Sequence, residues 1–118
     1  MRRMSFSITE PQLLDGSKTV TRRLGWKTLK PGDRLLAVDK AMGLKRGERS
    51  KILGEIEILD VRREPLREIT QDDVNREGFL HLVRHEFIEM FCQAMSCTRD
   101  TEVTRIEFRF TPASEAKP

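Results

Sequence analysis

The segment Gly16-Ser17-Lys18-Thr19-Val20-Thr21-Arg22-Arg23 combines a lysine, hydroxyl side chains and two arginines on what is expected to be one extended strand. Extended backbone alternates its side chains, which predicts two sets on opposite faces: Lys18, Val20, Arg22 and Thr19, Thr21, Arg23. An unpaired ammonium or guanidinium group in an apolar interior is expensive, so this strand cannot bury both faces at low cost. We therefore expect an anionic or polar group to meet it.

Charge is unevenly distributed along the chain. Residues 1–51 carry 13 Lys or Arg against 5 Asp or Glu, a net charge of +8, and residues 52–118 carry 9 against 14, a net charge of −5. A basic half indicates an electropositive surface that meets phosphate, which makes RNA a candidate partner. Solvated charge on the surface of a small domain is the alternative.

Two histidines and two cysteines in the spacing H-x3-H-x6-C-x4-C raise the question of zinc: His81, His85, Cys92 and Cys97. Structural zinc sites usually contain tighter C-x2-C pairs, and these cysteines straddle an expected helix end. We therefore predict no metal and no cofactor, with zinc as the alternative. Cys92 is expected to be a small buried hydrophobe and Cys97 a loop thiol, both reduced.

The 118 residues fit a single domain, residues 1–118. No apolar run approaches the roughly 20 residues that a helix needs to cross a bilayer, and the basic N-terminus lacks the apolar core of a signal peptide. These features predict a soluble, cytoplasmic protein with no membrane partner.

Short elements must position the residues that could do chemistry. Alternation and turn signals predict strands over residues 4–8, 18–23, 34–38, 52–61 and 103–110, and a polar, flexible tail over residues 111–118. Caps and periodicity predict helices from Glu10 to near Gly16, over residues 71–78 and over residues 83–95. In the last strand the alternation predicts Ile106, Phe108 and Phe110 on the core face, with Arg105, Glu107 and Arg109 outside. This mixture predicts an α+β fold, a small β-barrel of five or six strands with three flanking helices.

The order of these motifs resembles the ASCH domain family, a group within the PUA-like β-barrel superfamily, over roughly residues 5–110. The matching features are the Gly16–Arg23 segment, the turn Lys30-Pro31-Gly32-Asp33, Arg76-Glu77-Gly78-Phe79, a helix with Phe87 and Phe91, and the closing strand Thr104-Arg105-Ile106-Glu107-Phe108. The resemblance implies a PUA-like barrel of mostly antiparallel strands, with a cleft between the G-x-K strand and the helix that bears the E-G-F glutamate.

The family is thought to act on RNA or nucleosides, and one branch hydrolyses the amide of N4-acetylcytidine with a lysine, a threonine and a glutamate. By motif these residues fall on Lys18, Thr21 and Glu77. Other members are proposed to be RNA-binding modules, and some to cleave RNA. The resemblance therefore leaves three functions open: an amidohydrolase acting on acetylated cytidine, a non-catalytic RNA-binding or regulatory module, and a metal-independent ribonuclease.

The residue chemistry is compatible with the amidohydrolase. Lys18 would act as the base, because burial lowers the pKa of an amine, and Thr21 would be the nucleophile. Glu77 would pass a proton to the leaving amine, and Arg23 or backbone amides would stabilise the oxyanion. Residues three apart on a strand point to opposite faces, so a bulge or strong twist is needed to join Lys18 and Thr21. A purely structural Lys18–Glu77 ion pair is the alternative.

Four further side chains are candidates for substrate binding: Arg22 and Arg23 for phosphate, Trp26 and Phe79 for stacking on a base. A core position is the alternative for Trp26. The glycine-containing loop of residues 39–51 is expected to be mobile, and its cations suit RNA phosphates: Lys40, Lys45, Arg46, Arg49 and Lys51. An uncommitted surface insertion is the alternative for this loop.

Overall fold

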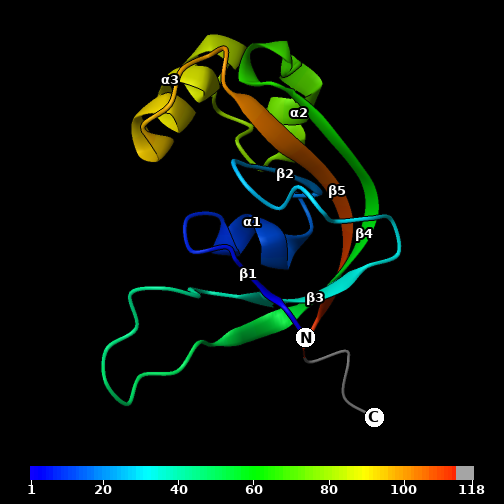
Figure 1. Cartoon of the computed structure of the whole chain (residues 1–118), viewed down its shortest axis with the longest axis vertical. Helices are drawn as coiled ribbons and strands as arrows, with labels where there is room; N and C mark the ends of the chain where they lie inside the picture. The colour runs from blue at the N-terminus through cyan, green and yellow to red at the C-terminus, as the bar shows by residue number, and fades with distance from the viewer. Residues whose placement is uncertain (114–118) are drawn as a thin grey trace.

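The protein folds around a single five-stranded sheet in the computed structural model, which describes residues 1–113. The strands are β1 (Arg3–Ser5), β2 (Val20–Arg23), β3 (Arg34–Val38), β4 (Ile52–Pro65) and β5 (Glu102–Pro112), in the order β1-β3-β4-β5-β2. All neighbouring strands are antiparallel except β1 and β3. The predicted α+β class and mostly antiparallel sheet are confirmed, but the sheet does not close, so it is a curved open sheet rather than a strict barrel (Figure 1).

The three predicted helices are present as α1 (Glu10–Asp15), α2 (Gln71–Arg76) and α3 (Arg84–Met95), with a 3-10 turn at Leu66–Glu68. Gly16 ends α1 in the left-handed conformation, with φ of 86°. Thr70 caps α2, since its side chain accepts a hydrogen bond from the Asp73 backbone N–H. Both α2 and α3 are inserted between β4 and β5 and lie together at one end of the molecule (Figure 1).

Two apolar clusters hold the fold together. The first joins the β1, β3 and α1 side to the sheet: Met4, Phe6, Leu13, Leu29, Leu35, Ala37, Leu53, Ile56, Ile58, Ile106 and Phe108. The second lies among α2, α3 and the far ends of β4 and β5: Leu66, Ile69, Val74, Phe79, Phe87, Ile88, Phe91 and Val103. The predicted core face of β5 is correct for Ile106 and Phe108, while Phe110 is partly buried.

Arg105 is a correction. It was expected outside, but it is 4% exposed and lies on the face of β5 that the α2 carboxylate of Asp73 covers. Alternation places Arg105 and Ile106 on opposite faces of β5. Both faces are buried here, because one is covered by the first cluster and the other by α2.

Several element ends differ from the expectation, and the larger differences are in the strands. β1 is shorter than residues 4–8, β2 starts at Val20 rather than residue 18, and β4 continues to Pro65. At the end of the chain, residues 111 and 112 belong to β5, where they pair with Glu55 and Gly54. The remainder of the expected tail, residues 114–118, lies outside the described residues. Within residues 1–113, no helix combines the length and the apolar character needed to cross a membrane.

Candidate functional site

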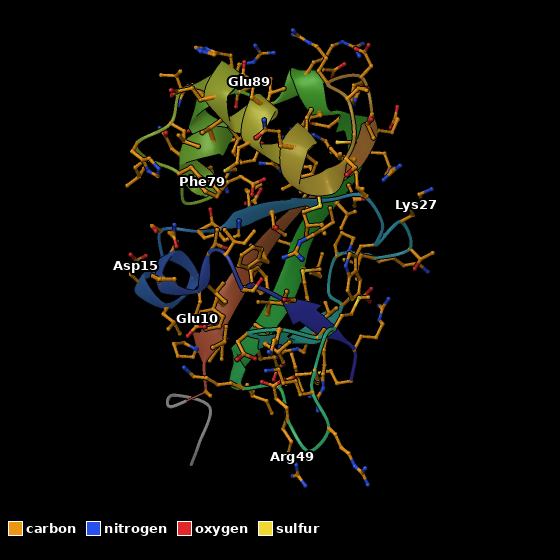
Figure 2. All side chains as sticks on the ribbon, turned by 90° about the vertical axis from the view of Figure 1, so that its left-hand side faces the viewer. Glu10, Asp15, Lys27, Arg49, Phe79 and Glu89 are labelled. Atoms are coloured by element: carbon orange, nitrogen blue, oxygen red, sulfur yellow. The ribbon has the colours of Figure 1, made fainter. Side chains whose placement is uncertain are left out.

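A cavity of about 170 Å³ lies between β2, the segment before α1, the end of α2 and one face of α3. Its charged and hydroxyl lining includes Lys18, Thr21, Arg22, Arg23 and Glu77, and its apolar lining includes Phe6, Ile8, Phe79, Phe87, Met90, Phe91, Ala94 and Met95. Figure 2 faces this side of the molecule, with α3 above β2 and Phe79 labelled beside them. The structure thus brings Lys18, Thr21 and Glu77 to one cavity, together with Arg22, Arg23 and Phe79.

Lys18 and Glu77 form a buried ion pair at this cavity. The Lys18 ammonium donates to Glu77 Oε1 at 2.9 Å and to the Glu77 carbonyl oxygen at 2.9 Å, and the two side chains are 3% and 4% exposed. Burial lowers the pKa of Lys18 below its ordinary 10.5, while the Glu77 carboxylate opposes this shift. The pair therefore places an amine of reduced basicity within hydrogen-bond distance of a carboxylate.

Backbone contacts of the segment before β2 hold Lys18 in place. The Lys18 N–H donates to the Gln12 carbonyl at 3.0 Å, and the Thr19 N–H donates to the Arg76 carbonyl at 2.8 Å. Gly78, which follows Glu77, has φ of 99°, and a Cβ there would lie 2.8 Å from the Gln12 Cβ. Glycine in the E-G-F motif therefore allows α1 to pack directly against the turn that carries Glu77.

Thr21 is held by Arg23 rather than by Lys18. The Arg23 Nε–H donates to Thr21 Oγ1 at 3.1 Å, and its Nη2 donates to the Ser5 carbonyl at 2.7 Å. The guanidinium lies 5.0 Å from the centre of the Phe6 ring. Because Thr21 Oγ1 accepts from Arg23, its own hydroxyl proton remains available to a ligand or a base.

β2 contains no bulge of the kind expected to join Lys18 and Thr21. The register from Val20 opposite Glu107 to Arg23 opposite Thr104 is regular, but Lys18 lies before the strand and is free of its alternation. Within residues 1–113 no hydrogen bond joins Lys18 Nζ to Thr21 Oγ1. The two side chains therefore share the cavity without a hydrogen bond between them in the described part of the chain.

Arg22 is part of an internal charge network. Its side chain is 0% exposed, and Nη2 donates to Glu64 at 2.8 Å and to Asp73 at 2.7 Å. Asp73 also accepts two hydrogen bonds from Arg105, at 2.7 and 3.0 Å. Burial raises the pKa of Asp73, but the two guanidinium groups outweigh burial and hold that pKa well below its ordinary 3.8.

Three buried atoms of this network have no hydrogen-bond partner in the described part of the chain: Arg22 Nε, Arg22 Nη1 and Glu77 Oε2. Arg22 Nη1 and Glu77 Oε2 are 3.5 Å apart, so they attract each other without a well-formed hydrogen bond. Arg22 thus links the Asp73 network to the Lys18–Glu77 pair, and its guanidinium is directed at protein carboxylates.

The two aromatic candidates lie in different places. Phe79 lines the cavity and packs edge-to-face on Phe87, with ring centres 5.5 Å apart. Trp26 does not line the cavity; it packs against the first apolar cluster, and the Arg2 guanidinium lies 5.7 Å from its ring. Trp26 therefore packs at the edge of the core, as the alternative interpretation expected, and does not lie where it could stack on a base in this cavity.

The basic loop of residues 39–51 lies at the opposite end of the molecule from α3, as the label at Arg49 shows in Figure 2. Lys40 pairs with Glu48 at 3.1 Å and Lys51 with Glu10 at 3.2 Å. Within residues 1–113, the exposed side chains of Lys45, Arg46 and Arg49 form no ion pair. None of the loop cations lines the cavity.

Cys92 and Cys97 are free, partly buried thiols near the end of α3. Burial and the neighbouring Cys97 raise the pKa of the Cys92 thiol above its ordinary 9.0. Among residues 1–113, no three His, Cys, Asp or Glu side chains are grouped so that they could hold a metal ion.

The sequence did not indicate the charge network beside the cavity, in which Glu64 and Asp73 bind Arg22 and Asp73 also binds Arg105. Asp73 lies in the first turn of α2, where the helix dipole favours an acidic residue whether or not it has a distant partner. No local signal pairs it with an arginine 32 positions away on β5. The apolar wall from Met90, Ala94 and Met95 follows α-helical spacing and could have been found from that period.

This open, mostly antiparallel sheet with helices inserted before its last strand has the fold of an ASCH domain. The ASCH domain from Lactobacillus crispatus JV V101 superimposes with a TM-score of 0.61 at 14% identity, over 92% of this chain and 78% of that one. The expected ASCH resemblance is thus confirmed at the level of the fold.

Two further crystal structures share the fold. Protein EF3133 from Enterococcus faecalis V583, described under DUF984, has a TM-score of 0.65 and 16% identity over 94% of this chain and 80% of that one. The hypothetical protein PH0355 has a TM-score of 0.66 and 16% identity over 94% of this chain and 100% of that one. No protein-family model matches the sequence, and no curated protein matches it.

Proposed function

We propose that this protein is a nucleoside- or RNA-binding domain of the cytoplasm whose cavity hydrolyses the amide of N4-acetylcytidine or a similar acylated base. The buried pair of Lys18 and Glu77, in a cavity that Thr21 also lines, is the observation that carries the proposal. The ASCH fold supports it, because the branch of that family with this activity uses a lysine, a threonine and a glutamate.

The proposed reaction begins with attack of Thr21 Oγ1 on the acyl carbonyl carbon. Glu77 takes a proton from the Lys18 ammonium, and the resulting neutral amine accepts the hydroxyl proton of Thr21. The carbonyl oxygen becomes an oxyanion that the free N–H groups of Arg23 stabilise. Collapse breaks the bond to N4, which takes a proton from the Lys18–Glu77 pair, so cytidine leaves. Water then hydrolyses the threonine ester and releases the carboxylic acid, which restores the hydroxyl.

The geometry sets one condition on this reaction. Lys18 Nζ donates to Glu77 in the structure and makes no bond to Thr21, so the proton must reach the amine through the substrate or a bridging water. Phe79, at the cavity wall, would pack on the base, and the small cavity suits a single nucleobase rather than a run of stacked bases.

The test is to incubate the full chain with N4-acetylcytidine and follow the release of cytidine by chromatography. Thr21→Ala and Lys18→Ala are expected to lower kcat at least about 100-fold, within the range that general bases and nucleophiles contribute. Thr111→Ala, an exposed threonine on β5, is the matched control and is expected to retain full turnover. No turnover by the unaltered chain, or equal turnover by Thr21→Ala, would end the enzymatic proposal.

A second candidate function is RNA binding without catalysis, and the unpaired cations of the basic loop favour it. Lys45, Arg46 and Arg49 are exposed and free of protein carboxylates within residues 1–113. This function predicts that affinity for single-stranded RNA falls steeply with salt, with no product formed. Affinity that does not change with salt would contradict it.

A further inference from the structure

One cation of the cavity, Arg23, forms no ion pair with a carboxylate in the described part of the chain. Lys18 and Arg22 are bound to carboxylate oxygens at 2.9 Å or less. Within residues 1–113, by contrast, no Asp or Glu oxygen lies within the 4.0 Å ion-pair distance of the Arg23 guanidinium. Its protein partners are two neutral oxygens, Thr21 Oγ1 and the Ser5 carbonyl. The cavity therefore has a positive charge that a ligand could neutralise.

Arg23 also retains hydrogen-bonding capacity. A guanidinium carries five N–H donors, and the structure uses Nε and one N–H of Nη2. Nη1 makes no hydrogen bond to any residue in the described part of the chain. Burial also lowers the pKa of Arg23 below its ordinary 12.5, and the more distant Glu77 carboxylate opposes this shift only in part. An anion at the free N–H groups would reverse that penalty.

The rest of the wall is apolar and limits the kind of anion. The Phe6 ring underlies the guanidinium, and Phe79, Met90 and Phe91 form other parts of the lining. One unpaired cation matches a single negative charge, whereas a phosphate dianion would carry an unmatched charge into this apolar surface. A planar carboxylate also fits the fork of N–H donors that a guanidinium presents.

We propose that the cavity binds a small monocarboxylate, with its carboxylate on Arg23 and its aliphatic or aromatic body against Phe79 and the apolar face of α3. The inference goes beyond the proposed function, because it concerns binding and needs no bond to be cleaved. Such an acid has two sources: the acid half that an acylated base releases, or a free acid that enters the cavity on its own.

The first experiment uses the unaltered full chain and isothermal titration calorimetry at constant ionic strength. Acetate, butyrate and the uncharged butyramide are the probes. Butyrate should bind about 15-fold more tightly than acetate, which corresponds to about fourfold for each of two buried methylenes. Butyramide should bind at least about tenfold more weakly than butyrate. Absence of saturable butyrate binding, or equal affinity for butyrate and butyramide, overturns the proposal.

The second experiment removes the charge at Arg23. Arg23→Gln should weaken butyrate at least about tenfold, the loss expected when a charge-assisted hydrogen bond is removed. Arg34→Gln is the matched control, because it removes the same charge from a side chain that is 61% exposed and outside the cavity. Butyrate binding that Arg23→Gln leaves unchanged overturns the proposal. The comparison of butyrate with butyramide stands even where Arg23→Gln is poorly folded.

A third arm separates the two sources of the acid. When the carboxylate is the acid half of the substrate, butyrate and cytidine occupy the cavity together, so saturating cytidine leaves butyrate affinity unchanged or higher. When it is a free acid that takes the place of the base, the two compete. A chain that releases cytidine but binds no butyrate contradicts only this inference. A chain that binds butyrate but never releases cytidine contradicts only the enzymatic proposal.

Discussion

The cavity beside β2 and the loop of residues 39–51 both hold several cations, but within residues 1–113 most of them are paired with carboxylates in the cavity and most are unpaired in the loop. In the cavity, Lys18 and Arg22 are 3% exposed and bound to carboxylates. In the loop, Lys45, Arg46 and Arg49 are exposed and free of ion pairs within residues 1–113. A buried charge is costly unless the fold or a ligand matches it, whereas an exposed charge is solvated and can meet an external anion. The same residue types are therefore held mainly by internal ion pairs in one region and mainly by solvent in the other.

The largest expected effect comes from breaking the cavity network at Asp73. Asp73→Asn removes the charge that balances Arg22 and Arg105, and it should lower the free energy of unfolding by about 3–5 kcal/mol in urea denaturation. Asp100→Asn is the matched control, since Asp100 pairs with Arg67 but is 74% exposed, and it should change stability by less than about 1 kcal/mol. Equal losses from the two substitutions would erase the contrast between buried and exposed charge.

Lowering the pH should destabilise the folded protein through the same network. The pKa of Asp73 is lower in the folded protein than its ordinary 3.8, so its contribution to stability is present above 3.8 and is lost as the pH falls below it. The unaltered chain should lose stability steeply with falling pH in this range, and Asp73→Asn should show a shallower loss. Parallel pH profiles of the two proteins, measured by thermal unfolding, would contradict this assignment.

The next effect separates structure from chemistry at Lys18 and Glu77. Lys18→Met leaves a buried carboxylate without its close partner and should cost about 3 kcal/mol of stability. The double substitution Lys18→Met/Glu77→Leu removes both charges and should recover most of that loss while hydrolysis of N4-acetylcytidine stays absent. A double variant that still releases cytidine would show that the pair is only structural.

A smaller effect is expected where α1 meets the turn after Glu77. Gly78→Ala introduces a side chain at φ of 99° and places its Cβ 2.8 Å from Gln12, so we expect a loss of about 2–3 kcal/mol. Gly32→Ala is matched in φ, at 94°, but its Cβ would meet open space, so only the backbone penalty of about 1 kcal/mol remains. The difference between the two losses in free energy of unfolding, measured by urea denaturation, reports how tightly α1 packs against the turn that carries Glu77.

The smallest effect on stability is expected in the loop. Replacing Lys45, Arg46 and Arg49 together by Gln should change the free energy of unfolding by less than about 0.5 kcal/mol. If the loop binds single-stranded RNA, the slope of log affinity against log salt should become shallower by about 2, since each phosphate contact contributes roughly 0.7. An unchanged slope would separate the loop from RNA binding.

The sequence predicted most strands well because the alternation of apolar and polar residues along each strand indicates which side chains are buried. Ile56 and Ile58 alternate with Glu55 and Glu57, and the structure buries the isoleucines and leaves the glutamates partly exposed. The three helices followed from caps that act within a few residues, such as Thr70 and Gly16. The open edges of the sheet did not follow, because closure depends on pairing between strands that are distant in the sequence.

The site was predicted only in part. The motifs indicated Lys18, Thr21 and Glu77, and the structure places all three at one cavity. The prediction that Lys18 lies within the strand was wrong, because its backbone bonds to Gln12 on α1 rather than to β5. The buried position of Arg105 was also missed, since its partner on α2 comes from a distant part of the chain. Contacts of this kind have no local signature.

The way β4 and β5 meet also bears on how this protein folds. Pro65 pairs with Glu102, and the Leu66 N–H donates to the Thr101 carbonyl at 2.9 Å, so α2 and α3 leave and rejoin the sheet at one point. Pairing across so long an intervening segment is entropically unfavourable until the segment itself is compact, and such non-local contacts slow folding. Glu77 lies within residues 66–101, so the Lys18–Glu77 pair is itself a contact between distant parts of the chain. We expect the cavity to be among the last parts of the molecule to form and, on unfolding, among the first to open.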